Sequence, residues 1–339
     1  MTIDSDTAGT ARSLAGRRVL VTGAGGFIGS HLVDRLLAEG ATVRALVRYN
    51  SRSHWGHLET VATNDRLDIM PGDVCDPALV RTAVEGCDTV FHLAALIAIP
   101  YSYLAPHSYV QTNVMGTLNV LEAARHCGVR RVVHTSTSET YGTARRVPID
   151  EDHPLQGQSP YAASKIGADK LAESYFLSFG VPVTTIRPFN TYGPRQSARA
   201  VIPTIISQIL AGRRSVRLGS LAPVRDFNFV ADTVDGFIAL ATSDAAVGEV
   251  VNIGSGVAIS IGETAALIQQ LMGTAVDIVA DDKRVRPEAS EVLQLVCNPG
   301  KASRLAQWRP RTGLREGLAQ TIAYIEGHLG DYKIGIYNV

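Results

Sequence analysis

The chain has 339 residues, 45% of them hydrophobic, which allows a sizeable core in two domains or one large α/β unit. Lysine plus arginine equals aspartate plus glutamate at 32 each, so no bulk charge favours nucleic acid or an anionic membrane as a partner. The four cysteines show no paired CxxC spacing, and the N-terminus lacks the apolar stretch of a signal peptide or anchor. We therefore expect a cytoplasmic protein with free thiols and no metal site.

Residues 1–15 show no periodicity, which predicts a mobile arm before the first strand. Short apolar runs after it predict buried strands over residues 18–22, 43–47, 67–70, 89–93, 132–135 and 183–186. Helical patterns separate most of these runs, over residues 27–39, 114–126 and 161–179. This alternation predicts an α/β fold with a doubly wound parallel sheet of the Rossmann type.

The alternation weakens beyond Pro188, where glycine, proline and arginine become frequent. We expect residues 16–188 to form an NAD(P)-binding Rossmann domain and residues 189–330 to form a smaller substrate-binding part. The two parts are expected to interleave, because apolar segments between residues 226 and 253 can return to the first domain.

A glycine triplet at Gly23, Gly26 and Gly29 directly follows the first predicted strand and opens a helix with Phe27 and Ile28. Without Cβ atoms the backbone can turn tightly and let a diphosphate approach the positive end of the helix dipole. A plain strand-to-helix turn is the alternative, but the position after a strand favours a dinucleotide-binding loop.

The second predicted strand ends without the acidic residue that binds a ribose 2′-hydroxyl. Arg48 stands there instead, and its charge can neutralise a 2′-phosphate, which favours NADP modestly over NAD. The alternative is that Arg48 and Arg52 are solvated loop charges.

Two further segments suit a dinucleotide at strand ends. Asp73 and Val74 follow the third strand, where Asp73 can lie near an adenine amino group. Leu93, Ala94 and Ala95 end the fourth strand with a stretch suited to close cofactor approach.

Tyr161 and Lys165 lie four residues apart in a predicted helix, so their side chains share one face. A nearby ammonium stabilises a phenolate, so we expect a lowered tyrosine pKa and a general base near neutral pH. Such a pair often lies on the protein surface without a catalytic role. The catalytic interpretation is supported by the hydroxyl-rich segment Thr137, Ser138 and Glu139 at the end of another strand. Thr137 can bind the substrate hydroxyl that Tyr161 deprotonates, although such segments also form simple turns.

Residues 22–29, 92–95 and 187–194, together with Thr137, Tyr161 and Lys165, resemble the extended short-chain dehydrogenases that act on nucleotide sugars. The resemblance covers nearly the whole chain. Residues 94–103, 136–139 and 193–199 are more specifically similar to the 4,6-dehydratases of the legionaminic-acid pathway, which act on nucleotide-linked N-acetylglucosamine.

The resemblance implies 4,6-dehydration of UDP- or GDP-N-acetylglucosamine with a tightly bound NAD(P)+. Glu139 is expected to remove the C5 proton and to protonate the departing hydroxyl. Hexose 4,6-dehydratases of this group commonly have aspartate where this chain has Ser138, so Glu139 would act as both acid and base, helped by Ser138 or a water. A 4-epimerase, a 5,6-dehydratase and a non-catalytic NAD(P)-sensing protein remain alternatives.

The same resemblance assigns substrate contacts. Asn190, Arg225 and Arg286 are expected to bind the diphosphate, because arginine pairs with phosphate oxygens through two N–H groups. The alternative for Arg225 is a pair with Asp226 or with solvent.

Ser102 and Tyr103 are expected to contact the hexose. A homodimer is expected by analogy with the family.

Overall fold

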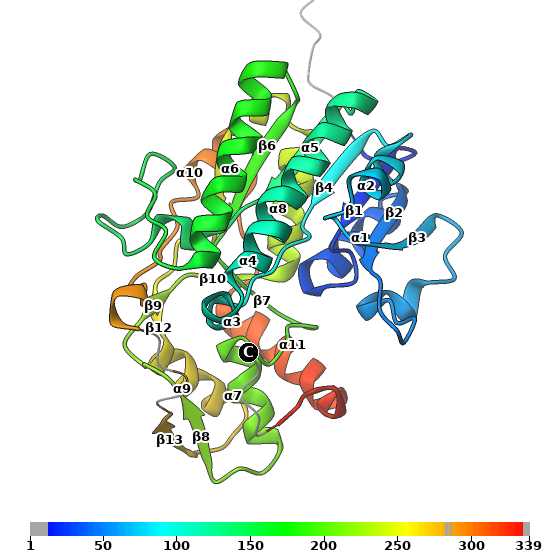
Figure 1. The fold of residues 1–339 in the computed structure, drawn as a ribbon. Coiled ribbons are helices and arrows are strands. Elements are labelled where there is room, and N and C mark those ends of the chain that lie inside the picture. Colours follow the sequence, from blue (N-terminus) through cyan, green and yellow to red (C-terminus); the bar gives the residue numbers. More distant parts are fainter. Residues whose placement is uncertain (1–12, 282–283, 285–286, 335–339) are drawn as a thin grey trace, which may run out of the picture.

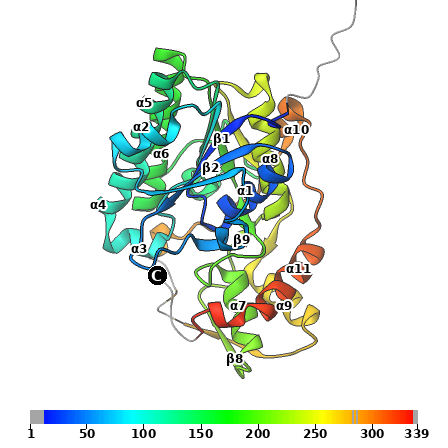
Figure 2. The same ribbon diagram turned by 90° about the vertical axis from the view of Figure 1, so that its right-hand side faces the viewer.

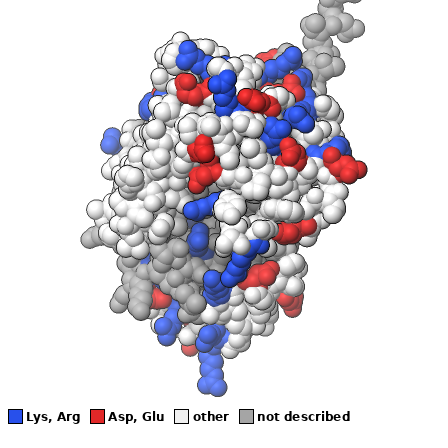
Figure 3. Space-filling view, turned by 45° about the vertical axis from the view of Figure 1, so that its right-hand side comes forward, with Lys and Arg blue, Asp and Glu red and all other residues white. Residues whose placement is uncertain are grey.

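The computed structural model describes residues 13–281, 284 and 287–334 (Figure 1). The predicted arm at residues 1–15 lies outside this part of the chain, apart from residues 13–15. No helix among the described residues is long and apolar enough to cross a membrane. Both signs of charge lie on the face shown in Figure 3, in keeping with the balanced composition.

A seven-stranded parallel sheet forms the centre of the molecule, with the strand order β11-β6-β5-β4-β1-β2-β3. The predicted doubly wound α/β fold is therefore confirmed. The strands are β1 (Arg18–Thr22), β2 (Thr42–Arg48), β3 (Leu67–Gly72), β4 (Thr89–His92), β5 (Arg131–Thr135), β6 (Val183–Pro188) and β11 (Val250–Ile253).

Helices cover both faces of the sheet, as the two views in Figures 1 and 2 show. One face carries α1 (Phe27–Ala38), α8 (Val230–Thr242) and α10 (Gly300–Ala306). The other carries α2 (Pro77–Val84), α5 (Gly116–Cys127) and α6 (Pro160–Phe179). Two short helices, α3 (Ile99–Leu104) and α4 (Pro106–Tyr109), follow β4 near the carboxyl edge of the sheet.

Local sequence explains both ends of α6, the helix that carries Tyr161 and Lys165. Ser159 caps the N-terminus, since its hydroxyl accepts a hydrogen bond from Ala162 N at 3.1 Å, and Pro160 stands at the first helical position. Gly180 ends the helix at φ +68°, a left-handed conformation that glycine adopts at little cost. The start of the helix is thereby held at the carboxyl edge of the sheet.

A smaller part lies below that edge in Figure 1 and has its own apolar core. Its helices are α7 (Val201–Leu210), α9 (Ile261–Leu271) and α11 (Leu314–Gly327). Its strands pair as β7 (Asn190–Tyr192) with β10 (Phe227–Phe229), β8 (Ser215–Leu218) with β13 (Asp277–Ala280), and β9 (Val224–Arg225) with β12 (Ile259–Ser260). The chain returns to the large sheet through α8 and β11, which pairs with β6. The boundary at residues 188 and 189 stays a prediction.

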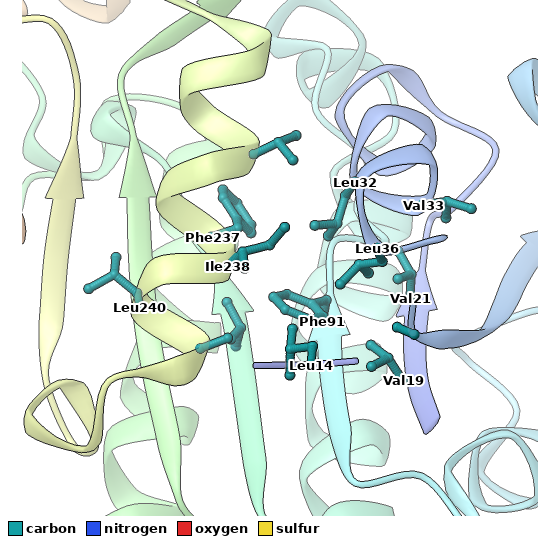
Figure 4. Close-up of a cluster of buried hydrophobic side chains, with 14 of the residues drawn as sticks. Leu14, Val19, Val21, Leu32, Val33, Leu36, Phe91, Phe237, Ile238 and Leu240 are labelled. Carbon is teal, nitrogen blue, oxygen red and sulfur yellow. The ribbon is translucent and has the colours of Figure 1, made fainter. Parts of the chain in front are cut away.

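The core between the sheet and helices α1 and α8 is drawn in Figure 4. Phe91 of β4 and Phe237 of α8 are both fully buried there, and Leu32 and Leu36 of α1 belong to the same cluster. Because interiors are close-packed, this cluster fixes how the two helices lie on the sheet.

We predict that Phe237→Ala lowers the free energy of unfolding by about 3–5 kcal/mol, because it removes a buried ring and leaves a cavity. Chemical denaturation followed by circular dichroism measures the loss. Leu177→Ala is the control, since this side chain is 73% exposed on α6, and its cost should stay within about 0.5 kcal/mol. Equal costs for the two variants would contradict the assigned core.

Candidate active site

The glycine-rich loop packs tightly against its own helix and against the end of β4. Gly23 has φ +69°, and a Cβ there would lie 2.9 Å from Ala94 N. A Cβ on Gly29 would lie only 2.3 Å from Gly23 O. Both positions therefore require glycine.

The loop leaves the N-terminus of α1 free for an anion. Gly26 caps the helix without a side-chain hydrogen bond, and no acidic residue lies in the first turn, which includes Phe27 and Ile28. The first-turn N–H groups and the helix dipole then favour a bound diphosphate. These residues fit a dinucleotide cofactor.

The other predicted cofactor residues follow strands β2, β3 and β4 at the same edge of the sheet. Arg48 ends β2 and is exposed. Asp73 follows β3, where one carboxylate oxygen accepts a hydrogen bond from Cys75 N at 2.9 Å, and Val74 beside it is buried. Leu93, Ala94 and Ala95 after β4 are partly buried. The strand order thus brings the three segments to one edge.

Thr137, Tyr161 and Lys165 come together at the carboxyl end of β5, and all three are buried. The Thr137 hydroxyl accepts a hydrogen bond from Glu139 N at 3.2 Å and interacts with the Tyr161 phenol. Lys165 Nζ donates to Thr135 O at 2.6 Å. The lysine is therefore bound to the end of β5.

The expectation that the pKa of Tyr161 is lowered is wrong when only the protein's own groups act on it. Burial raises the pKa of Tyr161, and the charge of Glu139 raises it further, while the hydrogen bond from Thr137 opposes both. Burial also lowers the pKa of Lys165 to about 8. The error arose because the spacing of two residues shows their proximity but not how far they lie from solvent.

Ser138 and Glu139 lie on η3 (Ser138–Tyr141), a short 3₁₀ turn directly after Thr137. Ser138 is buried, whereas Glu139 is partly exposed and near enough to Tyr161 to affect its pKa. Glu139 thus belongs to the same short turn that follows Thr137, and its carboxylate can exchange protons with a substrate bound there.

Two of the predicted diphosphate ligands lie on short strands of the smaller part that belong to two different two-stranded sheets. Asn190 begins β7, and its Oδ1 atom is buried without a hydrogen-bond partner among the described residues. Arg225 ends β9, is 6% exposed, and donates to Glu291 Oε1 at 3.3 Å. The buried guanidinium suits an anionic ligand such as a diphosphate, whereas the unpaired oxygen of Asn190 is an acceptor and suits a hydrogen-bond donor of a ligand. Arg286, the third predicted ligand, lies outside the described residues.

Asp226, the alternative partner of Arg225, has a different role. Its carboxylate accepts hydrogen bonds from Ser255 N, Ser255 Oγ, Gly256 N and Cys297 N, at 2.6–3.0 Å. These bonds tie β10 to the loop after β11. Glu291, which pairs with Arg225, was missed by the sequence analysis because only the fold brings the two together.

The predicted hexose contacts lie on α3. Ser102 is fully buried, and its hydroxyl donates to Ile99 O of the same helix at 2.7 Å. The Tyr103 hydroxyl is bonded to Ser290 Oγ, which also donates to Gln158 O at 2.7 Å. Their role toward a sugar stays a prediction.

The sequence also does not predict a buried ionic network around Asp169, which lies on α6 four residues after Lys165. Asp169 is 4% exposed and is bonded to His134, Ser136 and Arg187. Its position four residues after Lys165 is the one signal in the sequence that predicts a shared helix face.

The cofactor loop and the catalytic residues together define the class of protein. A loop built for a dinucleotide diphosphate lies at the same sheet edge as a buried Tyr161 and Lys165 pair, as in Rossmann enzymes of the short-chain dehydrogenase type. The family described as GDP-mannose 4,6 dehydratase matches residues 20–321, so the chain belongs to this family of extended short-chain dehydrogenases, which includes nucleotide-sugar dehydratases and epimerases.

Individual relatives are similar over almost their whole length. The chain is 36% identical to UDP-glucose 4-epimerase of Mycolicibacterium smegmatis, over 91% of this chain and 98% of that one. The solved dTDP-glucose 4,6-dehydratase DesIV from Streptomyces venezuelae, with NAD and TYD bound, is 32% identical, with a TM-score of 0.85 over 93% of this chain and 99% of that one. UDP-N-acetylglucosamine 4-epimerase from Methanobrevibacter ruminantium is 27% identical, with a TM-score of 0.83 over the same shares of both chains.

We predict that Gly29→Ala abolishes detectable cofactor binding, because the added methyl group would overlap Gly23 O and force the loop open. Isothermal titration calorimetry with NAD+ and NADP+ measures the effect. Gly313→Ala is the control, since a Cβ there meets nothing within 4 Å and the residue has φ −66°. Unchanged cofactor affinity in Gly29→Ala would contradict the assigned loop.

Proposed function

We propose that the protein is a nucleotide-sugar 4,6-dehydratase that acts on UDP- or GDP-N-acetylglucosamine. The observation that carries the proposal is the place of Glu139 on the turn directly after Thr137, where its backbone N–H donates to the Thr137 hydroxyl, because a 4-epimerase has no step that needs a carboxylate there. The similarity to an N-acetylglucosamine epimerase supports the acetamido sugar. Residues 94–103 and 193–199, which resemble the legionaminic-acid-pathway enzymes, support the same substrate class.

The first step is oxidation at C4 of the sugar. Tyr161 takes the proton of the C4 hydroxyl, and Thr137 orients that hydroxyl and the phenol. A bound oxidised nicotinamide supplies the hydride acceptor and a positive charge that favours the phenolate. Lys165 in its ammonium form compensates the negative charge on Tyr161. Asn190, Arg225 and Arg286 hold the diphosphate and thereby fix the sugar against these groups.

The second step is loss of water across C5 and C6. The C4 ketone acidifies the C5 proton, which Glu139 removes as a base. Glu139 then returns a proton to the C6 hydroxyl as it leaves, assisted by Ser138 or a water in the position where related dehydratases commonly have aspartate. Glu139 then takes a proton from solvent and delivers it to C5, and Tyr161 releases the C4 hydroxyl proton to solvent. With the hydride that a bound cofactor would return to C6, the product would be a 4-keto-6-deoxy sugar.

The second candidate is a 4-epimerase, favoured by the 36% identity to a UDP-glucose 4-epimerase. In that reaction the 4-keto sugar rotates and takes the hydride on its other face, so Glu139 has no required step. A 5,6-dehydratase would release the unsaturated sugar instead. A non-catalytic NAD(P)-sensing protein would have no use for Thr137, Tyr161 and Lys165.

We also propose that the cofactor is NADP rather than NAD, that the protein is a homodimer, and that it works in the cytoplasm. Arg48 at the end of β2 supports the first statement, since its charge can pair with a 2′-phosphate. Light scattering and cell fractionation test the other two.

We predict that UDP- or GDP-N-acetylglucosamine loses water in the presence of the enzyme. In heavy water the product gains a deoxy-methyl proton signal and deuterium at C5, as read by mass spectrometry and NMR. Glu139→Gln should lower dehydration at least about 100-fold, as expected for loss of a general acid–base group. Reduction of the bound cofactor, followed at 340 nm, should persist in this variant.

Other outcomes identify the alternatives. Inversion at C4 without change of mass, retained by Glu139→Gln, would establish the epimerase, and alkene protons would establish the 5,6-dehydratase. Cofactor binding without conversion of any nucleotide sugar would favour the sensing protein.

We predict that Arg48→Ala weakens NADP+ binding about 5- to 50-fold and leaves NAD+ binding within about twofold, because only NADP+ carries the 2′-phosphate with which the guanidinium forms a charge-assisted bond. Competition between the two cofactors, measured by calorimetry, tests this. Arg52→Ala is the control for a loop charge. Equal losses for both cofactors in Arg48→Ala would contradict the NADP proposal.

A further inference from the structure

Lys165 lies in a largely buried cluster of charged and titratable groups, of which the proposed reaction uses only Tyr161, Lys165 and Glu139. The groups around Lys165 come from five elements. They are His92 of β4, His134 of β5, Arg187 of β6, and Tyr161 and Asp169 of α6, with Glu139 of η3 beside Tyr161.

Asp169 is the centre of this cluster. One carboxylate oxygen accepts from Ser136 Oγ at 2.8 Å and from Arg187 at 2.9 and 3.1 Å. The other is 3.1 Å from His134 Nε2. Burial opposes ionisation of Asp169, but the bond from His134 and the charge of Arg187 outweigh it and lower its pKa. The carboxylate is therefore negative in the folded protein.

Among the buried groups of the cluster, which do not include the partly exposed Glu139, the positive charges outnumber the negative ones. Burial lowers the pKa of His134, so this ring is neutral and donates from Nε2 to Asp169. Arg187 and Lys165 then supply two positive charges against the single negative charge of Asp169. Lys165 and Asp169 lie four residues apart on α6 and bind consecutive residues at the end of β5, Lys165 through Thr135 O and Asp169 through Ser136 Oγ. Burial lowers the pKa of Lys165, and the nearby negative charge of Asp169 raises it.

The same carboxylate also braces the segment that carries the catalytic threonine. Ser136 precedes Thr137 directly, and Arg187 donates to the Tyr141 hydroxyl at 3.0 Å at the other end of η3. Tyr141 in turn donates to Asn252 Oδ1 at 2.7 Å. Asp169 thus contacts Ser136 at one end of the segment directly and reaches Tyr141 at the other end through Arg187.

We propose that Asp169 is a positioning residue for the catalytic pair, which holds Lys165 as an ammonium ion and fixes residues 136–141 against Tyr161. This inference rests on the proposed use of Tyr161 and Lys165 in C4 oxidation. It predicts an electrostatic effect on Lys165 that a packing role alone would not produce.

The first test is the pH dependence of cofactor reduction in single-turnover experiments with UDP- or GDP-N-acetylglucosamine. The rate falls at high pH as Lys165 loses its proton. Removing a nearby negative charge lowers the pKa of an ammonium group, so Asp169→Asn should move this alkaline limb about one pH unit lower. Ser136→Ala is the matched control, because it removes a hydrogen bond that the Asp169 carboxylate accepts but keeps the negative charge. The alkaline limb of its pH profile should not move. A lower rate with an unmoved limb in Asp169→Asn would overturn the proposal.

The second test needs no substrate. Melting temperatures at pH 7 are compared for the full-length protein, Asp169→Asn, Lys165→Met and the double variant. If the two charges interact, Asp169→Asn should lower the melting temperature less in the Lys165→Met protein than in the parent protein. If the two substitutions lower the melting temperature additively, the proposal is overturned. If Asp169→Asn does not fold, the same cycle is run in an Arg187→Gln background, which leaves no unpaired guanidinium beside the amide.

The two tests separate this inference from the proposed function. If no nucleotide sugar reduces the cofactor in the parent enzyme, the proposed function fails and the stability cycle decides about Asp169. If the parent enzyme turns over and the cycle is additive, the function stands and the inference fails.

Discussion

The hydroxyl of Thr22 joins the glycine-rich loop to the end of β4, and the rest of the site depends on this contact. Its oxygen accepts hydrogen bonds from Leu93 N and Ala94 N, both at 3.1 Å, and lies 2.9 Å from His92 Nδ1. A hydroxyl has one proton, so with both backbone donors in place Thr22 donates to His92. The loop can approach the strand end this closely because Gly23 has no Cβ.

From His92 the hydrogen bonds continue to the catalytic helix. His92 Nε2 lies 3.1 Å from the Thr117 hydroxyl, which donates to Asn113 O. The Asn113 amide donates to Ser164 Oγ, and Ser164 donates to Tyr161 O. Because these groups are buried, each lost bond would leave an unsatisfied polar atom, so the chain holds the cofactor loop and the catalytic tyrosine in one geometry.

Much of the fold followed from local patterns. The predicted strand at Arg18–Thr22 matches β1, and the predicted helix over residues 161–179 differs from α6 by one residue. Hydrophobic periodicity and capping residues are local signals, and the glycine triplet and the Tyr161 and Lys165 spacing are equally local. Arg225 shows what local patterns cannot predict. The alternative to its predicted diphosphate contact was a pair with its neighbour Asp226 or with solvent, and the fold brings Glu291 to it.

The sequence by itself determined the alternation of strands and helices, the class of cofactor loop, and which residue types stand at strand ends, because these depend on neighbours within a few positions. Only the tertiary structure decided the surroundings of those residues. Burial reversed the expected direction for the pKa of Tyr161, and Asp169, His134 and Arg187 form one cluster although they come from three different elements. Desolvation and long-range charge pairing depend on which segments the fold brings together, and no spacing along the chain contains that information.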